Sequence, residues 1–182
     1  MVTQQLDVAM EGLVVLIADS NAYTRRLTRM MLTNLGVKST YEAADGVAAL
    51  DAIRNVNPDV MIVDWDMPVL DGCEVMRIVR SPGDFPKANL PIIMLTDEGL
   101  QSRVSTAIRL GVHEFLVKPI SPKTLQQRLL GIILNPRPMV RAGKFYIPMP
   151  RRRVDLNEFI HHPDALLSPS YEHGVPLPAL AS

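Results

Sequence analysis

The stretch VMIVDWDMPVLDG, residues 60–72, joins a short apolar run to a loop that carries acids, a proline and a glycine. The run is rich in β-branched residues and ends abruptly on Asp64. Such a run, bounded by turn-forming residues, predicts a buried β-strand. The pair Asp71-Gly72 is typical of a turn that enters a helix. The stretch therefore predicts a buried strand that ends on a carboxylate and is followed by a tight loop.

The same alternation of strand and helix patterns extends over residues 11–134. Further strand patterns are LVVLI (13–17), the weaker STYEA (39–43), PIIML (91–95) and EFLVK (114–118). Helical periodicity and capping signals predict helices between and after them, over 21–36, 46–56, 71–79, 100–111 and 121–134. Strands that alternate with helices and are apolar on both faces indicate parallel βαβ units. We predict an α/β fold with a doubly wound, parallel five-stranded sheet.

Composition places limits on the class of protein. The 182 residues are 47% hydrophobic and carry 19 basic and 19 acidic side chains, so the net charge is zero. This balance argues against a generally basic nucleic-acid binder. The single cysteine, Cys73, excludes an intrachain disulfide and favours a reducing compartment. Without a secretory signal pattern or an apolar run of about 20 residues, we expect an intracellular, cytoplasmic protein that does not span a membrane.

The two ends of the chain differ from this central part. Residues 1–10 are interpreted as an N-terminal extension. Residues 135–182 hold eight of the 15 prolines, with basic residues first and acidic residues after them. We expect a largely extended, mostly irregular tail rather than a second core. A short helix is possible at 155–161, where Asp155 could cap a turn with one apolar face.

Four polar residues stand at the ends of predicted strands. They are Asp19, Asp64, Thr96 and Lys118. Because the carboxyl ends of parallel strands form one edge, where such sheets bind their ligands, these side chains should meet there. Two carboxylates suit a small hard cation such as Mg²⁺, and the ammonium and hydroxyl suit an anionic group. The sequence predicts a site for a metal ion and a phosphate.

Each of these residues also has a simpler interpretation. Asp64 and Asp66 could be turn formers before Pro68. Asp19 could merely cap the first helix, and Lys118 could be surface charge. We favour the shared site because all four residues stand at strand ends.

The order and spacing of these residues resemble the response-regulator receiver domain over residues 11–134. Three motifs carry the resemblance: VDWDMPVLDG (63–72), MLTD (94–97) and FLVKP (115–119). The resemblance implies a flavodoxin-like (βα)5 fold. It also implies a phosphoacceptor signalling protein, which catalyses only its own phosphoryl uptake and loss.

The resemblance assigns roles to the acidic and basic positions. Asp64 would accept a phosphoryl group from a histidine kinase or phosphotransfer protein. Asp19 and Asp64 would bind Mg²⁺ directly, and Asp66 would contribute its backbone carbonyl. Lys118 would pair with phosphate oxygens, and its bond to Pro119 would be cis.

Two further positions would form the switch. Thr96 would turn its hydroxyl toward the phosphate, and Phe115 would be the aromatic side chain that follows it inward. Phe115 has no phenol hydroxyl, so any coupling through such a group is absent here.

The chain departs from the family at the end of the first strand. Most active receivers have two adjacent acids there, whereas this chain has Ala18-Asp19. If Ala18 replaces an acid that orients metal-bound water, Mg²⁺ affinity should fall by on the order of 10–100-fold. The alternative is a receiver that seldom uses phosphate.

The basic part of the tail is a second candidate site. Its candidate ligand-binding residues are Arg141, Tyr146, Arg151, Arg152 and Arg153. Arginine forks bind phosphates and aromatic rings stack on bases. The segment weakly resembles the arginine-rich tails of CheY-like proteins that bind cyclic di-GMP, although IPMP stands where those tails carry Gly-Pro-Asp. A solvated basic linker is the favoured alternative.

Taken together, these patterns predict a bacterial, single-domain, CheY-like response regulator of a two-component pathway. Its partners would be a kinase or phosphotransfer protein and a downstream protein target. No DNA-binding domain is recognisable. The protein would be a monomer, or a dimer through the face of the fourth helix, fifth strand and fifth helix. The alternative function is a binding module whose tail senses cyclic di-GMP, with phosphorylation secondary or absent.

Overall fold

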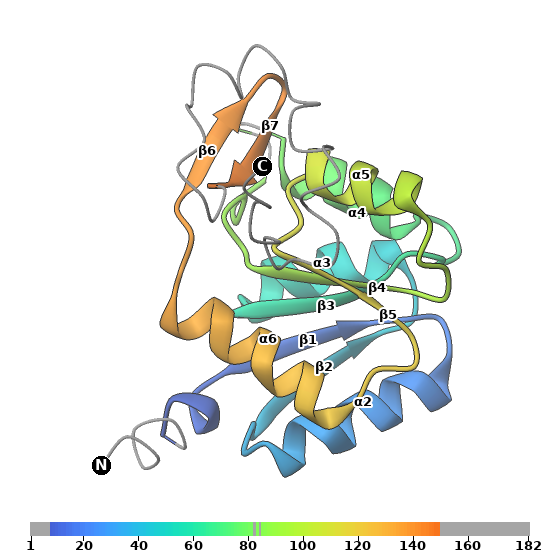
Figure 1. Cartoon of the computed structure of the whole chain (residues 1–182), viewed down its shortest axis with the longest axis vertical. Coiled ribbons are helices and arrows are strands. Elements are labelled where there is room, and N and C mark those ends of the chain that lie inside the picture. The colour runs from blue at the N-terminus through green and yellow to red at the C-terminus, as the bar shows by residue number, and fades with distance from the viewer. Residues whose placement is uncertain (1–7, 82, 84, 150–182) are drawn as a thin grey trace, which may run out of the picture.

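A computed structural model describes residues 8–149 except 82 and 84. Its centre is a five-stranded parallel sheet in the order β2-β1-β3-β4-β5, as Figure 1 shows. The strands are β1 (Val14–Ala18), β2 (Ser39–Ala43), β3 (Val60–Asp64), β4 (Ile92–Thr96) and β5 (Glu114–Val117). The predicted α/β, flavodoxin-like fold is confirmed, and each predicted strand is present to within about one residue at each end.

Helices cover both faces of the sheet. They are α2 (Ala22–Asn34), α3 (Gly46–Val56), α4 (Gly72–Val79), α5 (Gln101–Arg109) and α6 (Pro122–Leu134). Helices α2 and α6 pack over one face and α3, α4 and α5 over the other, so the core divides into two apolar layers (Figure 1). None of the helices in the described part of the chain combines the length and the apolar character needed to cross a membrane.

Strands β3 and β4 lie in the middle of the sheet and are buried at every position. This explains why their sequences are apolar up to the last residue of each strand rather than alternating. Strand β2 is an edge strand in which only Ala43 is buried, which accounts for its weaker pattern. The two central strands therefore hold their carboxyl ends, Asp64 and Thr96, in a rigid frame.

Side-chain caps fix the starts of the helices next to that edge. Asn21 caps α2 by accepting hydrogen bonds from the amides of Tyr23 and Thr24. Asp71 and Glu74 form a reciprocal capping box at the start of α4, as expected for such a pair. Because Asn21 is the cap of α2, Asp19 does not act as the helix cap.

The described part of the tail is more ordered than the sequence predicted. After α6 the chain forms an antiparallel hairpin of β6 (Met139–Ala142) and β7 (Phe145–Pro148) instead of largely irregular chain. Gly143 lies in the turn with φ of 59°, a conformation that favours glycine. Short alternating strands of this kind give a weak sequence signal, and two flanking prolines obscured it. The possible helix at 155–161 lies outside the described residues.

The hairpin packs against the α/β domain rather than standing apart from it. The amide of Tyr146 donates to the carbonyl of Arg80 at 3.1 Å, and Ile147 is buried beside Ile108. Gly111 lies so close to β7 that a Cβ atom there would come within 2.4 Å of the Tyr146 carbonyl oxygen. The contact therefore depends on close approach of two backbones.

Arg80 is a fully buried charged residue next to this contact. Its guanidinium donates to the backbone carbonyls of Gly111 (3.1 Å), Ala88 (2.6 Å) and Leu90 (2.7 Å). Burial lowers the pKa of Arg80 to about 9, which leaves the group charged at neutral pH. Arg80 thus ties the end of α4 to the two chain segments that precede β4 and β5.

Val69 is a strained residue in the loop between β3 and α4. Its φ of 68° is left-handed, which a β-branched residue rarely adopts, and its side chain is 77% exposed. By contrast, Asn57, the other non-glycine residue with positive φ in the described chain, ends α3 and tolerates this conformation. The loop therefore carries strain that packing of the Val69 side chain does not offset.

Replacing Val69 by asparagine or glycine should stabilise the protein by about 1 kcal/mol. The strain is relieved and little packing is lost, because the side chain is exposed. Urea unfolding measures the change. The matched control Val69→Ile keeps the β-branch and should give no gain; an equal gain in that variant would contradict the strain argument.

Candidate functional site

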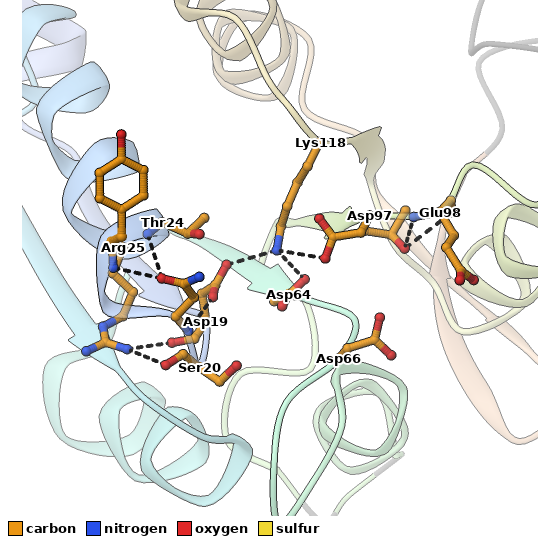
Figure 2. Close-up of polar contacts among 12 residues, drawn as sticks. Asp19, Ser20, Thr24, Arg25, Asp64, Asp66, Asp97, Glu98 and Lys118 are labelled. Carbon is orange, nitrogen blue, oxygen red and sulfur yellow. Dashed lines mark hydrogen bonds and ion pairs between the residues drawn. The ribbon is translucent and has the colours of Figure 1, made fainter.

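Polar side chains meet at the carboxyl edge of the sheet, as their positions at the ends of the strands predicted. Asp19 follows β1, Asp64 ends β3, and Lys118 follows β5. The ammonium of Lys118 lies 3.1 Å from Oδ2 of Asp19 and 2.8 Å from Oδ1 of Asp64. A third carboxylate, that of Asp97, lies 3.9 Å away (Figure 2). The structure therefore joins these groups in one charged cluster.

Apart from the exposed Asp97, the cluster is buried, unlike an ordinary surface ion pair. Asp19 and Asp64 are 2% and 4% exposed, and the Lys118 side chain is 14% exposed. This excludes the interpretation of Lys118 as free surface charge. Burial, which removes the carboxylate from water, raises the pKa of Asp64, and the nearby Lys118 opposes that rise without cancelling it.

The pKa of Lys118 is also raised, but for a different reason. Burial alone would lower the pKa of Lys118, but the close contact with the charge of Asp64, and then the hydrogen bond and charge of Asp19, raise it. Lys118 therefore stays protonated through the neutral range, and its ion pairing is lost only in alkali. An ammonium that stays charged at neutral pH beside a buried carboxylate is well placed to receive an anionic group.

Backbone contacts fix the position of Lys118. Its amide donates to the carbonyl of Thr96 at 2.8 Å, which extends the pairing of β4 and β5 by one residue. The Lys118–Pro119 peptide bond is cis, as the resemblance implied. The lysine side chain is thus held over the ends of β1 and β3.

The residues present fit a small divalent cation. Oδ1 of Asp64 is buried and, among the described residues, has no partner with hydrogen-bond geometry, although Lys118 lies 2.8 Å away. Asp19 supplies a second carboxylate close by. In the described ranges, no three His, Cys, Asp or Glu side chains cluster as a complete metal site. Two carboxylates with water and one backbone carbonyl suit Mg²⁺, which keeps much of its hydration shell.

Asp66 follows Asp64 in the loop and uses its side chain elsewhere. Oδ2 of Asp66 accepts from Arg103 at 2.7 Å. The metal role predicted for Asp66 involves its backbone carbonyl, which this side-chain contact leaves unchanged. That role stays a prediction.

The position of the missing acid has to be corrected. Ala18 is 1% exposed and packs in the apolar layer with Leu16 and Ala43, so an acid at this position would lie in the core. Ser20 follows Asp19 on its other side and is exposed. The second acid of the usual pair therefore corresponds to Ser20, and Asp19 is the first acid of that pair.

The predicted switch residues lie on the neighbouring strands β4 and β5, and Thr96 is held by a residue that the sequence did not indicate. Thr96 is fully buried and accepts a hydrogen bond from Arg103 at 2.9 Å. Arg103 also lies over the ring of Trp65, 5.0 Å from its centroid, and Trp65 meets Phe115 edge to face at 6.3 Å. No sequence pattern distinguishes Arg103, because it occupies an ordinary helical position. Only the tertiary fold brings it to the site.

The candidate tail site is described only in part. Arg141 and Tyr146 are cross-strand neighbours in the hairpin, and Arg141 is exposed. Arg151, Arg152 and Arg153 lie outside the described residues. Binding of cyclic di-GMP by this segment stays a prediction, as do the dimer face and the division into domains.

Comparisons with known proteins agree with this geometry. The family model for the response regulator receiver domain matches residues 15–130. A chemotaxis protein CheY homolog from Campylobacter jejuni is 36% identical over 119 residues, which is 65% of this chain and 90% of that protein.

Two solved structures extend the comparison. The receiver domain of a sensor histidine kinase from Pseudomonas aeruginosa, described with a magnesium ion in its active-site cleft, has a TM-score of 0.59 at 28% identity and covers 68% of this chain and 98% of its own. The CheX–CheY complex from Borrelia burgdorferi with BeF3 and magnesium gives a TM-score of 0.60 at 28% identity, with coverage of 66% and 88%. With its fold, its strand-end cluster and these relatives, the chain belongs to the response regulator receiver domain family and is a CheY-like signalling protein.

Proposed function

We infer that the protein is a response regulator that accepts a phosphoryl group on Asp64 and thereby changes its binding to other proteins. The observation that carries this inference is the buried contact of Lys118 with both Asp64 and Asp19, at 2.8 and 3.1 Å. A buried carboxylate beside a fixed ammonium is a nucleophile with a cation ready to receive the incoming anion.

The transfer itself can be written for a phosphohistidine donor. A carboxylate oxygen of Asp64 forms a bond to phosphorus while the phosphorus–nitrogen bond of the donor breaks. The electron pair of that bond stays on the imidazole, which takes up a proton from solvent. Lys118 neutralises charge on the phosphoryl oxygens, and the tight loop 65–72 holds Asp64 in place. In such transfers the protein contributes mainly positioning and charge neutralisation.

Magnesium fits the same site. Asp19 and Asp64 would hold it through carboxylate oxygens and Asp66 through its carbonyl. When bound, the ion supplies charge neutralisation for the phosphoryl oxygens.

A donor and a target protein follow from this chemistry. The donor would be a histidine kinase or a phosphotransfer protein, because the nucleophile is a carboxylate that can accept from phosphohistidine. The CheX–CheY complex shows that a solved CheY relative of similar fold binds another protein in the presence of BeF3 and magnesium. This supports protein binding as the output here, with activity confined to the receiver's own phosphoryl uptake and loss.

Incubation with Mg²⁺ and acetyl phosphate tests the assignment. Intact-mass measurement should show a gain of one phosphoryl group in the wild-type protein and none in Asp64→Asn. Asp51→Asn is the matched control, since Asp51 is exposed on α3 away from the site. A folded wild-type protein that gains no mass, or a gain that persists in Asp64→Asn, would refute the assignment.

A further inference from the structure

Arg103 makes an unusual set of contacts between the two loops that flank the site. It lies in the first turn of α5, and its side chain is 19% exposed. One terminal nitrogen donates to Oδ2 of Asp66 at 2.7 Å and to Oγ1 of Thr96 at 2.9 Å. The other lies 3.1 Å from Oε2 of Glu98. The guanidinium thus joins the loop after β3 to the loop after β4.

The Thr96 hydroxyl has no hydrogen-bonding capacity left. It donates its proton to the carbonyl of Glu98 at 3.3 Å, and it accepts from the amide of Glu98 at 3.2 Å and from Arg103 at 2.9 Å. A hydroxyl offers one donor and two acceptor sites, so all three are used. Within the described part of the chain, it makes no hydrogen bond to Asp64 or Lys118.

The contacts of Arg103 and Thr96 have a consequence for switching. A phosphoryl oxygen can bind the Thr96 hydroxyl only if the hydroxyl withdraws its proton from the carbonyl of Glu98. Because the hydroxyl in its present rotamer makes no hydrogen bond to Asp64 or Lys118, we expect the Thr96 side chain to turn about its Cα–Cβ bond to reach the phosphoryl group, and this turn would break the hydrogen bond from the charged Arg103. Hydrogen bonds with a charged partner are about twice as strong as neutral ones, so Arg103 should be the stronger of the two restraints.

We propose that Arg103 is a latch that holds Thr96 in its unphosphorylated position and must release it when Asp64 is phosphorylated. The proposal rests on the proposed phosphoacceptor function. Arg103 is a positioning residue, because it contacts Thr96 and not Asp64. Asp66, Glu98 and the face of Trp65 anchor it from three sides, which prevents it from simply following the hydroxyl.

The latch links the site to helix α5. Arg103 is part of that helix, and Trp65, on which it lies, contacts Phe115 of β5. Release of Thr96 would therefore change the contacts of α5 and of Phe115 together. Phe115 has no hydroxyl through which it could be coupled to Thr96. The coupling would instead run through Arg103 and the indole of Trp65.

The first test needs no phosphate. Three-bond NMR couplings report the rotamer of Thr96, which should be single in the wild-type protein. Arg103→Met keeps the packing on Trp65 but not the hydrogen bonds, and Arg103→Lys keeps the charge but cannot form the fork. In both variants the couplings should take values averaged over more than one Thr96 rotamer. Arg109→Met, an exposed position on the same helix, should leave them unchanged. Unchanged couplings in both Arg103 variants would refute the latch.

The second test measures switching with beryllofluoride and Mg²⁺, followed through the amide signals of Thr96 and Phe115. Loss of the latch should tighten apparent binding by on the order of tenfold in Arg103→Met and somewhat less in Arg103→Lys. Equal or weaker binding in both variants would overturn the proposal and assign Arg103 a structural or ligand-binding role. If wild-type protein shows no response to beryllofluoride, the phosphoacceptor function fails, and the couplings alone decide whether Arg103 restrains Thr96.

Discussion

Replacing Ser20 by aspartate should raise the affinity of the site for Mg²⁺ by about 10–100-fold. The new carboxylate would stand next to Asp19, at the exposed end of β1, where it can remain hydrated and orient metal-bound water. Titration of Mg²⁺ by calorimetry, or through the fluorescence of the single tryptophan, Trp65, measures the change. An affinity within twofold of the wild type would show that Ser20 does not occupy the position of the second acid.

Ala18→Asp is the matched comparison, because it adds the same group two residues earlier. Its carboxylate would lie in the apolar layer beside Leu16 and Ala43, without a cation to pair with among the residues of that layer. It should destabilise the protein by several kcal/mol and bring no gain in Mg²⁺ affinity. A well-folded Ala18→Asp protein with tighter Mg²⁺ binding would restore the original assignment of the missing acid to this position.

Replacing Arg80 by methionine should lower the free energy of unfolding by roughly 3–5 kcal/mol. Methionine fills much of the same volume, but the carbonyls of Gly111, Ala88 and Leu90 would lose their donor in a buried environment. Removing the desolvated charge would offset only part of this loss. Urea unfolding at neutral pH gives the magnitude.

The control for this change lies on the same helix. Arg77 is exposed on α4, and Arg77→Met should alter stability by less than about 0.5 kcal/mol. Hydrogen exchange at the Tyr146 amide adds a second measurement, since that amide bonds to the carbonyl of Arg80. Equal stability of the two variants, with unchanged protection of Tyr146, would contradict the role assigned to the Arg80 guanidinium.

The sheet could be predicted from sequence because its strands are buried on both faces. Residues 60–64 and 92–96 are apolar and β-branched for that reason, and their ends carry the polar residues that parallel topology brings together. Asp64 and Lys118 are 54 residues apart in the chain, yet the position of each at a strand end was enough to predict their contact.

Other parts of the structure depend on information that a local pattern does not contain. Whether the second acid corresponds to Ala18 or Ser20 depends on a shift of two residues, which only the burial of Ala18 resolves. Arg103 reaches Thr96 through a long side chain whose direction is set by Asp66, Glu98 and Trp65. The burial of Arg80 likewise depends on carbonyls that the fold brings to it, from Ala88 and Leu90 in the segment before β4 and from Gly111 before β5.

The close approach of Gly111 to β7 has a practical consequence for protein engineering. The family match ends at residue 130, whereas the backbone that covers Gly111 comes from residues 146 and 147. A chimaera could use this receiver as its input domain, with the junction at the end of α6. Such a chimaera would lack the β6–β7 hairpin, whose backbone packs against Gly111. A junction placed after residue 149 would keep the hairpin that covers Gly111.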